Sequence, residues 1–147
     1  ELSNSTFTDA DLTGANLTDA VLESPNLDGT NLSGATLTRV TVTDGILTGT
    51  NLIGANLDGA ALGGSDLTGA NLMAASATNA DLTGADLSGA WLIGTVLTGS
   101  NLTSTTLAGT WLGGAVLDDT TSSGIIGVPA TLPAGWVLTD GSLVFTG

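Results

Sequence analysis

Leucine recurs at every fifth position through most of this chain. The positions from Leu2 to Leu117 that share this spacing number 24, and 21 of them hold Leu. The remaining three hold Phe7, Val42 and Ala77, which are also apolar. A period of five fits neither an α-helix, which turns every 3.6 residues, nor a strand, whose side chains alternate. The chain is therefore expected to turn a corner every five residues.

The other positions of each five-residue unit are also restricted. The residue two before Leu is nearly always small, and the residue just before Leu is Asn or Asp in 11 of 24 units. The second residue after Leu is Gly in 14 units. We expect one large and one small apolar side chain per unit to point inward. Gly or Asn then occupies the corner, where unusual backbone angles are needed.

Four such units close a square coil, so that residues 20 apart in the sequence lie above one another. Coils of this kind stack at the usual strand spacing of roughly 4.8 Å. The 24 units predict about six coils, a rod roughly 29 Å long at that spacing. The sequence thus predicts an all-β solenoid over residues 1–120, with columns of Leu flanked by columns of Ala at its centre.

The repeat resembles that of the pentapeptide-repeat family, whose consensus is A(D/N)LXX. Residues 15–19 (ANLTD), 55–59 (ANLDG) and 85–89 (ADLSG) match this consensus directly, and the repeat covers about four-fifths of the chain. The resemblance implies a right-handed quadrilateral β-helix. It implies little about function, because one fold serves many functions.

Residues 121–147 depart from the repeat and form a second predicted unit. Pro129 and Pro133 lack backbone donors, so we expect no regular ladder around them. Apolar residues flank Asp140-Gly141, a signal for a β-hairpin with a type I′ turn. The segment resembles a P-x-x-L-P-x-G-W-x-L-x-x-G-x-L unit that follows or separates pentapeptide arrays in bacterial proteins. It is either a cap on the last coil or a connector that meets another rod.

The composition excludes most kinds of catalysis. The chain has no His and no Cys, so it lacks an imidazole base, a thiol nucleophile and a zinc–thiolate site. Its 14 acidic residues fall at outward, solvated positions, where no pocket would raise a carboxyl pKa. We therefore predict that the protein is not an enzyme and binds neither a cofactor nor a metal.

The charge balance also limits the partners. Arg39 is the only cation in a chain of net charge −13, whereas a phosphate-binding groove needs several cations. We therefore expect no direct binding to nucleic acid. The chain also has no run of 18 apolar residues, so no membrane insertion is expected.

One face of the predicted solenoid gathers large apolar side chains. Trp91 and Trp111 precede leucines one coil apart, and Ile53, Met73 and Ile93 follow leucines in the neighbouring column. Such a patch is exposed unless something covers it. Three alternatives are open: the C-terminal segment folds back over the patch, the patch binds a partner such as a second subunit, or it is simply exposed. The candidate interaction residues of the whole chain are Trp91, Trp111, Ile53, Met73, Ile93, Trp136, Phe145, Leu2 and Phe7.

The N-terminal edge of the solenoid is the second candidate surface. The repeat starts at Leu2, so the layer that contains Leu2 and Phe7 would be exposed together with unpaired backbone groups. Native proteins cover such edges, and solenoids need caps. The cover is either a chain segment that precedes residue 1 or the C-terminal tail of another subunit. A head-to-tail contact of the latter kind builds a filament.

These features favour a non-enzymatic structural scaffold that self-associates outside the cytoplasm. The alternative comes from the resemblance, which implies an acidic DNA mimic. Some pentapeptide-repeat proteins, including quinolone-resistance proteins, bind DNA gyrase with an acidic rod, and such a protein would be cytoplasmic. The acidic residues here are spread over all faces of the predicted rod, which weakens this alternative.

Overall fold

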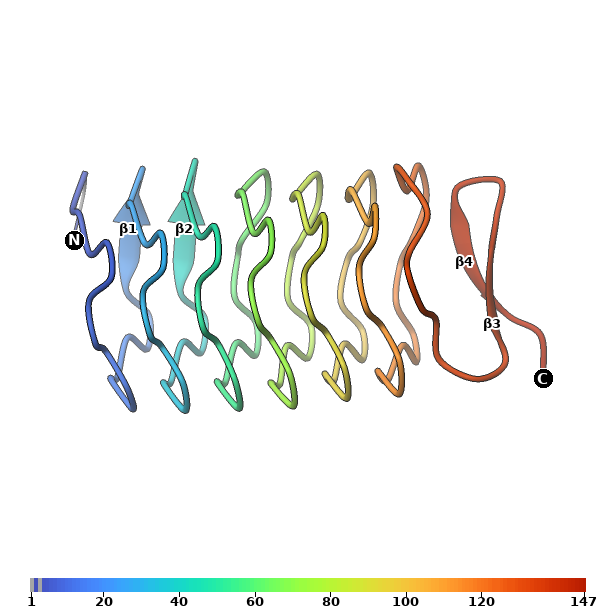
Figure 1. Cartoon of the computed structure of the whole chain (residues 1–147), viewed down its shortest axis with the longest axis horizontal. Coiled ribbons are helices and arrows are strands. Elements are labelled where there is room, and N and C mark those ends of the chain that lie inside the picture. Colours follow the sequence, from blue (N-terminus) through green and yellow to red (C-terminus); the bar gives the residue numbers. More distant parts are fainter. Residues whose placement is uncertain (1, 3) are drawn as a thin grey trace.

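The computed structural model describes residue 2 and residues 4–147. The chain winds into a rod whose coils stack along its long axis, with the N-terminus at one end and a hairpin near the other (Figure 1). Parallel bridges join residues 20 apart, from Thr6↔Asn26 to Trp111↔Thr131. Along the chain these bridges recur every five residues. The molecule is therefore a β-helix, as the leucine spacing predicted.

Regular strands are short because the backbone turns at every corner. β1 (Val21–Glu23) and β2 (Thr41–Thr43) pair in parallel, with Val21 opposite Thr41. β3 (Trp136–Thr139) and β4 (Ser142–Phe145) form the antiparallel hairpin. Elsewhere in the described part of the chain, each side of a coil contributes a single bridging residue to the ladder.

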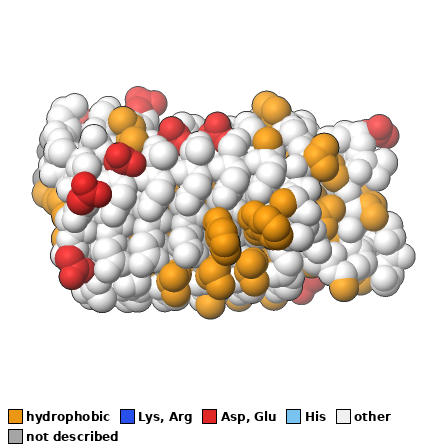
Figure 2. Space-filling model, in the orientation of Figure 1, with side chains coloured by type: hydrophobic (Ala, Val, Ile, Leu, Met, Phe, Trp, Pro, Cys, Tyr) orange, Lys and Arg blue, Asp and Glu red, His pale blue; other side chains and the backbone are white. Residues whose placement is uncertain are grey.

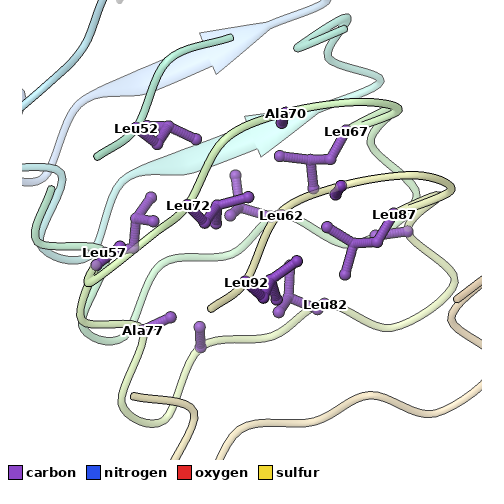
Figure 3. Packing of buried hydrophobic residues seen from close by; sticks show 14 of the residues in the cluster. Leu52, Leu57, Leu62, Leu67, Ala70, Leu72, Ala77, Leu82, Leu87 and Leu92 are labelled. Atoms are coloured by element: carbon purple, nitrogen blue, oxygen red, sulfur yellow. The ribbon is translucent and has the colours of Figure 1, made fainter. Parts of the chain in front are cut away.

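The core is the column of leucines that the repeat predicted. Leu52, Leu67 and Leu92 are fully buried, with no exposed surface, and Figure 3 shows side chains of successive coils directed into the rod. Fully burying a Leu side chain stabilises the fold by about 1.5–3 kcal/mol relative to leaving it exposed. Apolar burial repeated on every side of every coil is therefore what holds the rod together.

Buried threonines add a polar link between coils. Thr50 fills the small inward position, and its hydroxyl donates to the carbonyl oxygen of Leu27 in the preceding coil, 2.8 Å away. The buried hydroxyls of Ser65 and Ser100 have no hydrogen-bond partner among the described residues. Size alone therefore does not determine how well a residue suits this position. The other threonines that bond in the same way are Thr30, Thr95, Thr105 and Thr110.

Each corner places one residue in the left-handed backbone region. Gly54 has φ of 63° and suits this conformation, because it has no Cβ. Arg39 and Ala74 both have φ of 55° at equivalent corners. Residues other than Gly, Asn and Asp are unfavourable in this region. The expectation of Gly or Asn at the corners therefore holds for most units but not for these two. It also fails at six other corners, which hold Asp9, Asp19, Ser24, Asp44, Ser104 and Asp119.

The C-terminal segment continues the ladder before it closes the rod. We expected no regular ladder around the two prolines, and the structure has one isolated bridge there, between Thr131 and Trp111. Thr131 lies between Pro129 and Pro133 but keeps its own N–H, which donates to the carbonyl oxygen of Thr110 at 3.4 Å. Prolines two residues away thus do not prevent a single bridge.

The hairpin stacks on the end of the rod. Its turn residues Asp140 and Gly141 have φ of 48° and 71°, the positive values that a type I′ turn requires. Leu143 of β4 and Ile125 of the preceding segment are 7% and 8% exposed and belong to the core. One face of the hairpin therefore closes the apolar interior at this end of the rod (Figure 1).

Candidate interaction surfaces

The tryptophan pair lies on the outside of the rod. Trp91 bridges Trp111 in the next coil, with ring centroids 6.1 Å apart and ring planes 33° apart. The two side chains are 47% and 42% exposed. Ile53 and Ile93 in the neighbouring column are also exposed, and Met73 between them is partly buried. We call these residues, with the others that flank Leu32, Leu52, Leu72, Leu92 and Leu112, the Trp face.

The C-terminal segment does not cover the Trp face, so the fold-back alternative is wrong. The hairpin extends the rod along its axis instead of returning along a side (Figure 1). Its inner residues Leu138 and Leu143 belong to or pack against the apolar core at the end of the leucine column. In the view of Figure 2, apolar side chains accordingly remain exposed over the middle of the rod.

The N-terminal end has an open backbone edge. Asn31 donates its N–H to the carbonyl oxygen of Ala10 at 2.9 Å, and this pattern repeats in later coils. The equivalent N–H groups of the first coil, in Thr6, Asp11 and Asn16, have no acceptor among the described residues. The first coil therefore presents free ladder groups to whatever lies beyond it.

Apolar side chains accompany these free groups at the N-terminal end. Leu2 is 37% exposed, and Phe7, Leu12 and Leu17 are only partly buried. The leucines of the later coils are buried. The end of the rod thus combines backbone hydrogen-bonding groups with the uncovered end of the core.

The hairpin has an outward face at the opposite end. Val137 and Val144 are directly opposed in its ladder and are 39% and 43% exposed. Phe145 is 59% exposed and packs on Trp136, with ring centroids 5.6 Å apart. Trp136 also packs against the core, so its side chain is only partly exposed.

A shallow depression lies beside this hairpin. It has a volume of about 510 Å³ and is lined by Asp118, Asp119, Trp136 and Phe145. Two exposed carboxylates and two rings do not form a nucleophile–base pair of the kind that covalent catalysis requires. Nor does the part of the chain that the structure describes contain a cluster of His, Cys, Asp or Glu able to hold a metal ion.

Hydrogen bonds on the surface of the rod stabilise the charged form of two carboxyls, Asp19 and Asp66. Asp19 accepts bonds from the Nε and Nη2 of Arg39 at 2.6 and 2.8 Å, and this hydrogen-bonded pair holds the pKa of Asp19 below its ordinary value. Hydrogen bonds from the Thr68 hydroxyl and backbone N–H likewise lower the pKa of Asp66. Within the described residues, we find no helix with the length and hydropathy of a membrane-spanning segment.

Comparison with known proteins identifies the family. A family model for pentapeptide repeats matches eight copies, which together extend over residues 1–119. The chain therefore belongs to the pentapeptide-repeat family. No curated protein sequence matches it significantly.

Two solved structures illustrate the shared fold. QnrB1, a plasmid-mediated fluoroquinolone resistance protein, aligns with a TM-score of 0.78 and 24% identity over 84% of this chain and 63% of that chain. A pentapeptide repeat protein from the thylakoid lumen of Arabidopsis thaliana aligns with a TM-score of 0.62 and 28% identity over 63% of this chain and 65% of that chain. The present chain thus spans less than two-thirds of either structure. The likeness supports the β-helical fold.

Proposed function

We propose that this chain is a non-enzymatic scaffold subunit that self-associates end to end. The observation that carries the proposal is the open ladder edge of the first coil, where the N–H groups of Thr6, Asp11 and Asn16 lack acceptors among the described residues. Exposed parallel edges pair readily with another chain. A subunit stacked on this edge would satisfy those groups and cover Leu2 and Phe7.

The hairpin supplies the complementary surface at the other end. Val137, Val144 and Phe145 are exposed there, as are Ile126 and Val128, at 56% and 75%. Contact between this end and the N-terminal end of the next subunit is heterologous, so repetition gives an open filament unless the geometry closes a ring. A preceding segment of a longer chain is the other possible occupant of the N-terminal edge.

Three finer features belong to this proposal. The coil is right-handed and four-sided, with about six turns over residues 1–120, as the family resemblance and the five-residue period indicate. Residues 121–147 act as the cap and connector. We also propose an extracellular or cell-surface location, since a chain with one cation offers trypsin only Arg39 and has no thiol to oxidise.

Negative-stain microscopy tests the axial contact. The purified chain is expected to form thin fibres, and deletion of residues 121–147 should abolish them. Val144→Asp places a carboxylate on the outward face of the hairpin and should shorten the fibres without unfolding the rod. Monodisperse single rods of the wild-type chain at high protein concentration would contradict the proposal.

The gyrase-binding alternative has weaker support. The net charge of −13 fits an acidic DNA mimic, but a mimic needs carboxylates in rows that imitate successive phosphates. Among the bridges of the described residues, only Asp66↔Asp86 joins two carboxylates on adjacent coils. We therefore expect DNA gyrase supercoiling to be unaffected by the protein, and strong inhibition would favour the alternative.

A further inference from the structure

The Trp face carries no charge over five successive rungs. Its bridging column runs Asn31, Asn51, Asn71, Trp91 and Trp111, and the column beside it is equally free of carboxylates. Each of the other three sides of the rod carries acidic residues. Examples from those sides are Asp58 and Asp118, Asp81 and Glu23, and Asp66 and Asp86.

The corners beside the Trp face leave it flat. The column that precedes it holds Gly29, Gly49, Gly69, Gly89 and Gly109, and all five are exposed. The column that follows holds Gly at every rung except the middle one, where Ala74 stands. No long side chain at either edge therefore prevents another flat surface from approaching the indole rings. Corners elsewhere on the rod carry larger or charged residues, such as Asp19, Arg39 and Asp44.

We infer that the Trp face binds the Trp face of a second copy of this chain, side by side. Two copies of net charge −13 repel each other wherever carboxylates meet. The Trp face is the side on which they can approach without opposing carboxylates. A basic partner would gain more by binding the acidic sides. A face that binds itself gives a closed two-fold pair, so each rod has one lateral neighbour and the acidic sides prevent wider bundles.

The pairing is weak for an isolated subunit. The five rungs extend over roughly 19 Å at the usual strand spacing. One side of the rod over that length is smaller than the roughly 800 Å² per partner of a standard interface. The inference rests on the proposed self-association and deepens it, because axial stacking aligns many such faces and multiplies the lateral contact. Two exposed tryptophans on the last two rungs of the face supply the residue type that dominates binding energy at interfaces.

Asn71→Asp tests the pairing with a nearly isosteric change. The amide oxygen of Asn71 accepts the N–H of Met73 at 3.1 Å, and the carboxylate of Asp66 accepts the N–H of Thr68 in the same way at 2.9 Å. The repeat therefore accommodates Asp at this position, and the variant should fold. Asn101→Asp adds the same charge to another side of the rod, where the Asn101 side chain accepts the Thr103 N–H, and is the matched control.

Sedimentation equilibrium at low ionic strength is the measurement. Asn71→Asp should weaken lateral dimerisation roughly tenfold or more, because like charges opposed across an interface are strongly unfavourable. High salt should restore part of the affinity, and Asn101→Asp should behave as wild type. Replacing Trp91 and Trp111 by Thr should likewise weaken the dimer, whereas the same change at Val96 and Val116 should not. Equal dimerisation of Asn71→Asp and Asn101→Asp would overturn the inference.

The same measurement in the Val144→Asp background separates lateral pairing from axial stacking. If only the axial proposal fails, Val144→Asp leaves the size distribution of the wild type unchanged and Asn71→Asp still dissociates dimers. If only the lateral inference fails, Val144→Asp reduces the assembly to monomers and Asn71→Asp has no effect. Fibres of single-rod width for the wild-type chain would also contradict side-by-side pairing.

Discussion

Thr95 donates its buried hydroxyl to the carbonyl oxygen of Leu72, 2.6 Å away in the preceding coil. That carbonyl also accepts the N–H of Ala75 at 3.0 Å. One oxygen therefore bonds both to the corner of its own coil and to the following coil. A buried hydroxyl is costly unless it is bonded. The inward small position therefore accepts Thr because the stacked coils place an acceptor within reach.

Removing a satisfied hydroxyl and an unsatisfied one should change stability in opposite directions. Thr95→Val should destabilise the rod by about 1 kcal/mol, the usual net value of a hydrogen bond. Ser65→Ala should stabilise it by about 1 kcal/mol, because the Ser65 hydroxyl is buried without a partner among the described residues. Urea denaturation midpoints measure both changes. A Ser65→Ala variant less stable than wild type would contradict this description of the core.

The corner at Ala74 offers a second stabilising change. Ala74 is exposed at φ of 55°, a conformation that costs an L-residue roughly 1–2 kcal/mol. Ala74→Gly should raise the denaturation midpoint by an amount equivalent to about 1 kcal/mol, less the entropy that Gly adds to the unfolded chain. The reverse change, Gly34→Ala, lies in the same column at φ of 63° and should destabilise the rod. An unchanged midpoint in both variants would argue against strain at the corners.

A charge inside the leucine column should prevent folding. Leu67 has no exposed surface, so Leu67→Asp would bury a carboxylate with no partner, at a cost of several kcal/mol. Far-UV circular dichroism should show loss of the β-helical spectrum. Thr68→Asp, one residue along the chain on the outside, should keep it. A wild-type spectrum for Leu67→Asp would contradict the inward orientation of this column.

The leucine column and the corners were predictable because they depend on local spacing. A strict five-residue period with no insertion fixes which side chain of each unit points inward, so the burial of Leu52 and Leu92 followed from their positions alone. The hydrogen bond from Thr95 to Leu72 could not be predicted in this way, because the sequence indicates the size of an inward residue but not which carbonyl oxygen lies within its reach.

The surfaces were predictable in part. The sequence placed Trp91 and Trp111 together on an outward column, and the bridge between them agrees. It did not determine whether the C-terminal segment covers them, because that outcome depends on competition between two distant apolar surfaces. The hairpin residues Leu138 and Leu143 pack on the end of the core instead.

The ion pair of Asp19 and Arg39 predicts a specific pH dependence. The Arg39 guanidinium lowers the pKa of Asp19 in the folded chain, so the ion pair stabilises the fold above the ordinary carboxyl pKa. That contribution is lost as the pH falls through the lowered folded pKa. NMR titration of the Asp19 carboxyl should give a midpoint below 3.8. Arg39→Gln, which keeps a side chain at the same corner, should raise the midpoint towards the ordinary value. An unchanged midpoint would show that the pair does not form in solution.

Amide hydrogen exchange at the first coil tests the self-association most directly. In an isolated subunit the N–H groups of Thr6, Asp11 and Asn16 lack acceptors among the described residues, whereas Asn31 donates to Ala10 and serves as an internal reference. We predict that these three amides exchange rapidly in dilute protein and become protected as the concentration rises. Asn31 should be protected throughout. Rapid exchange of all three amides at every concentration would contradict end-to-end assembly.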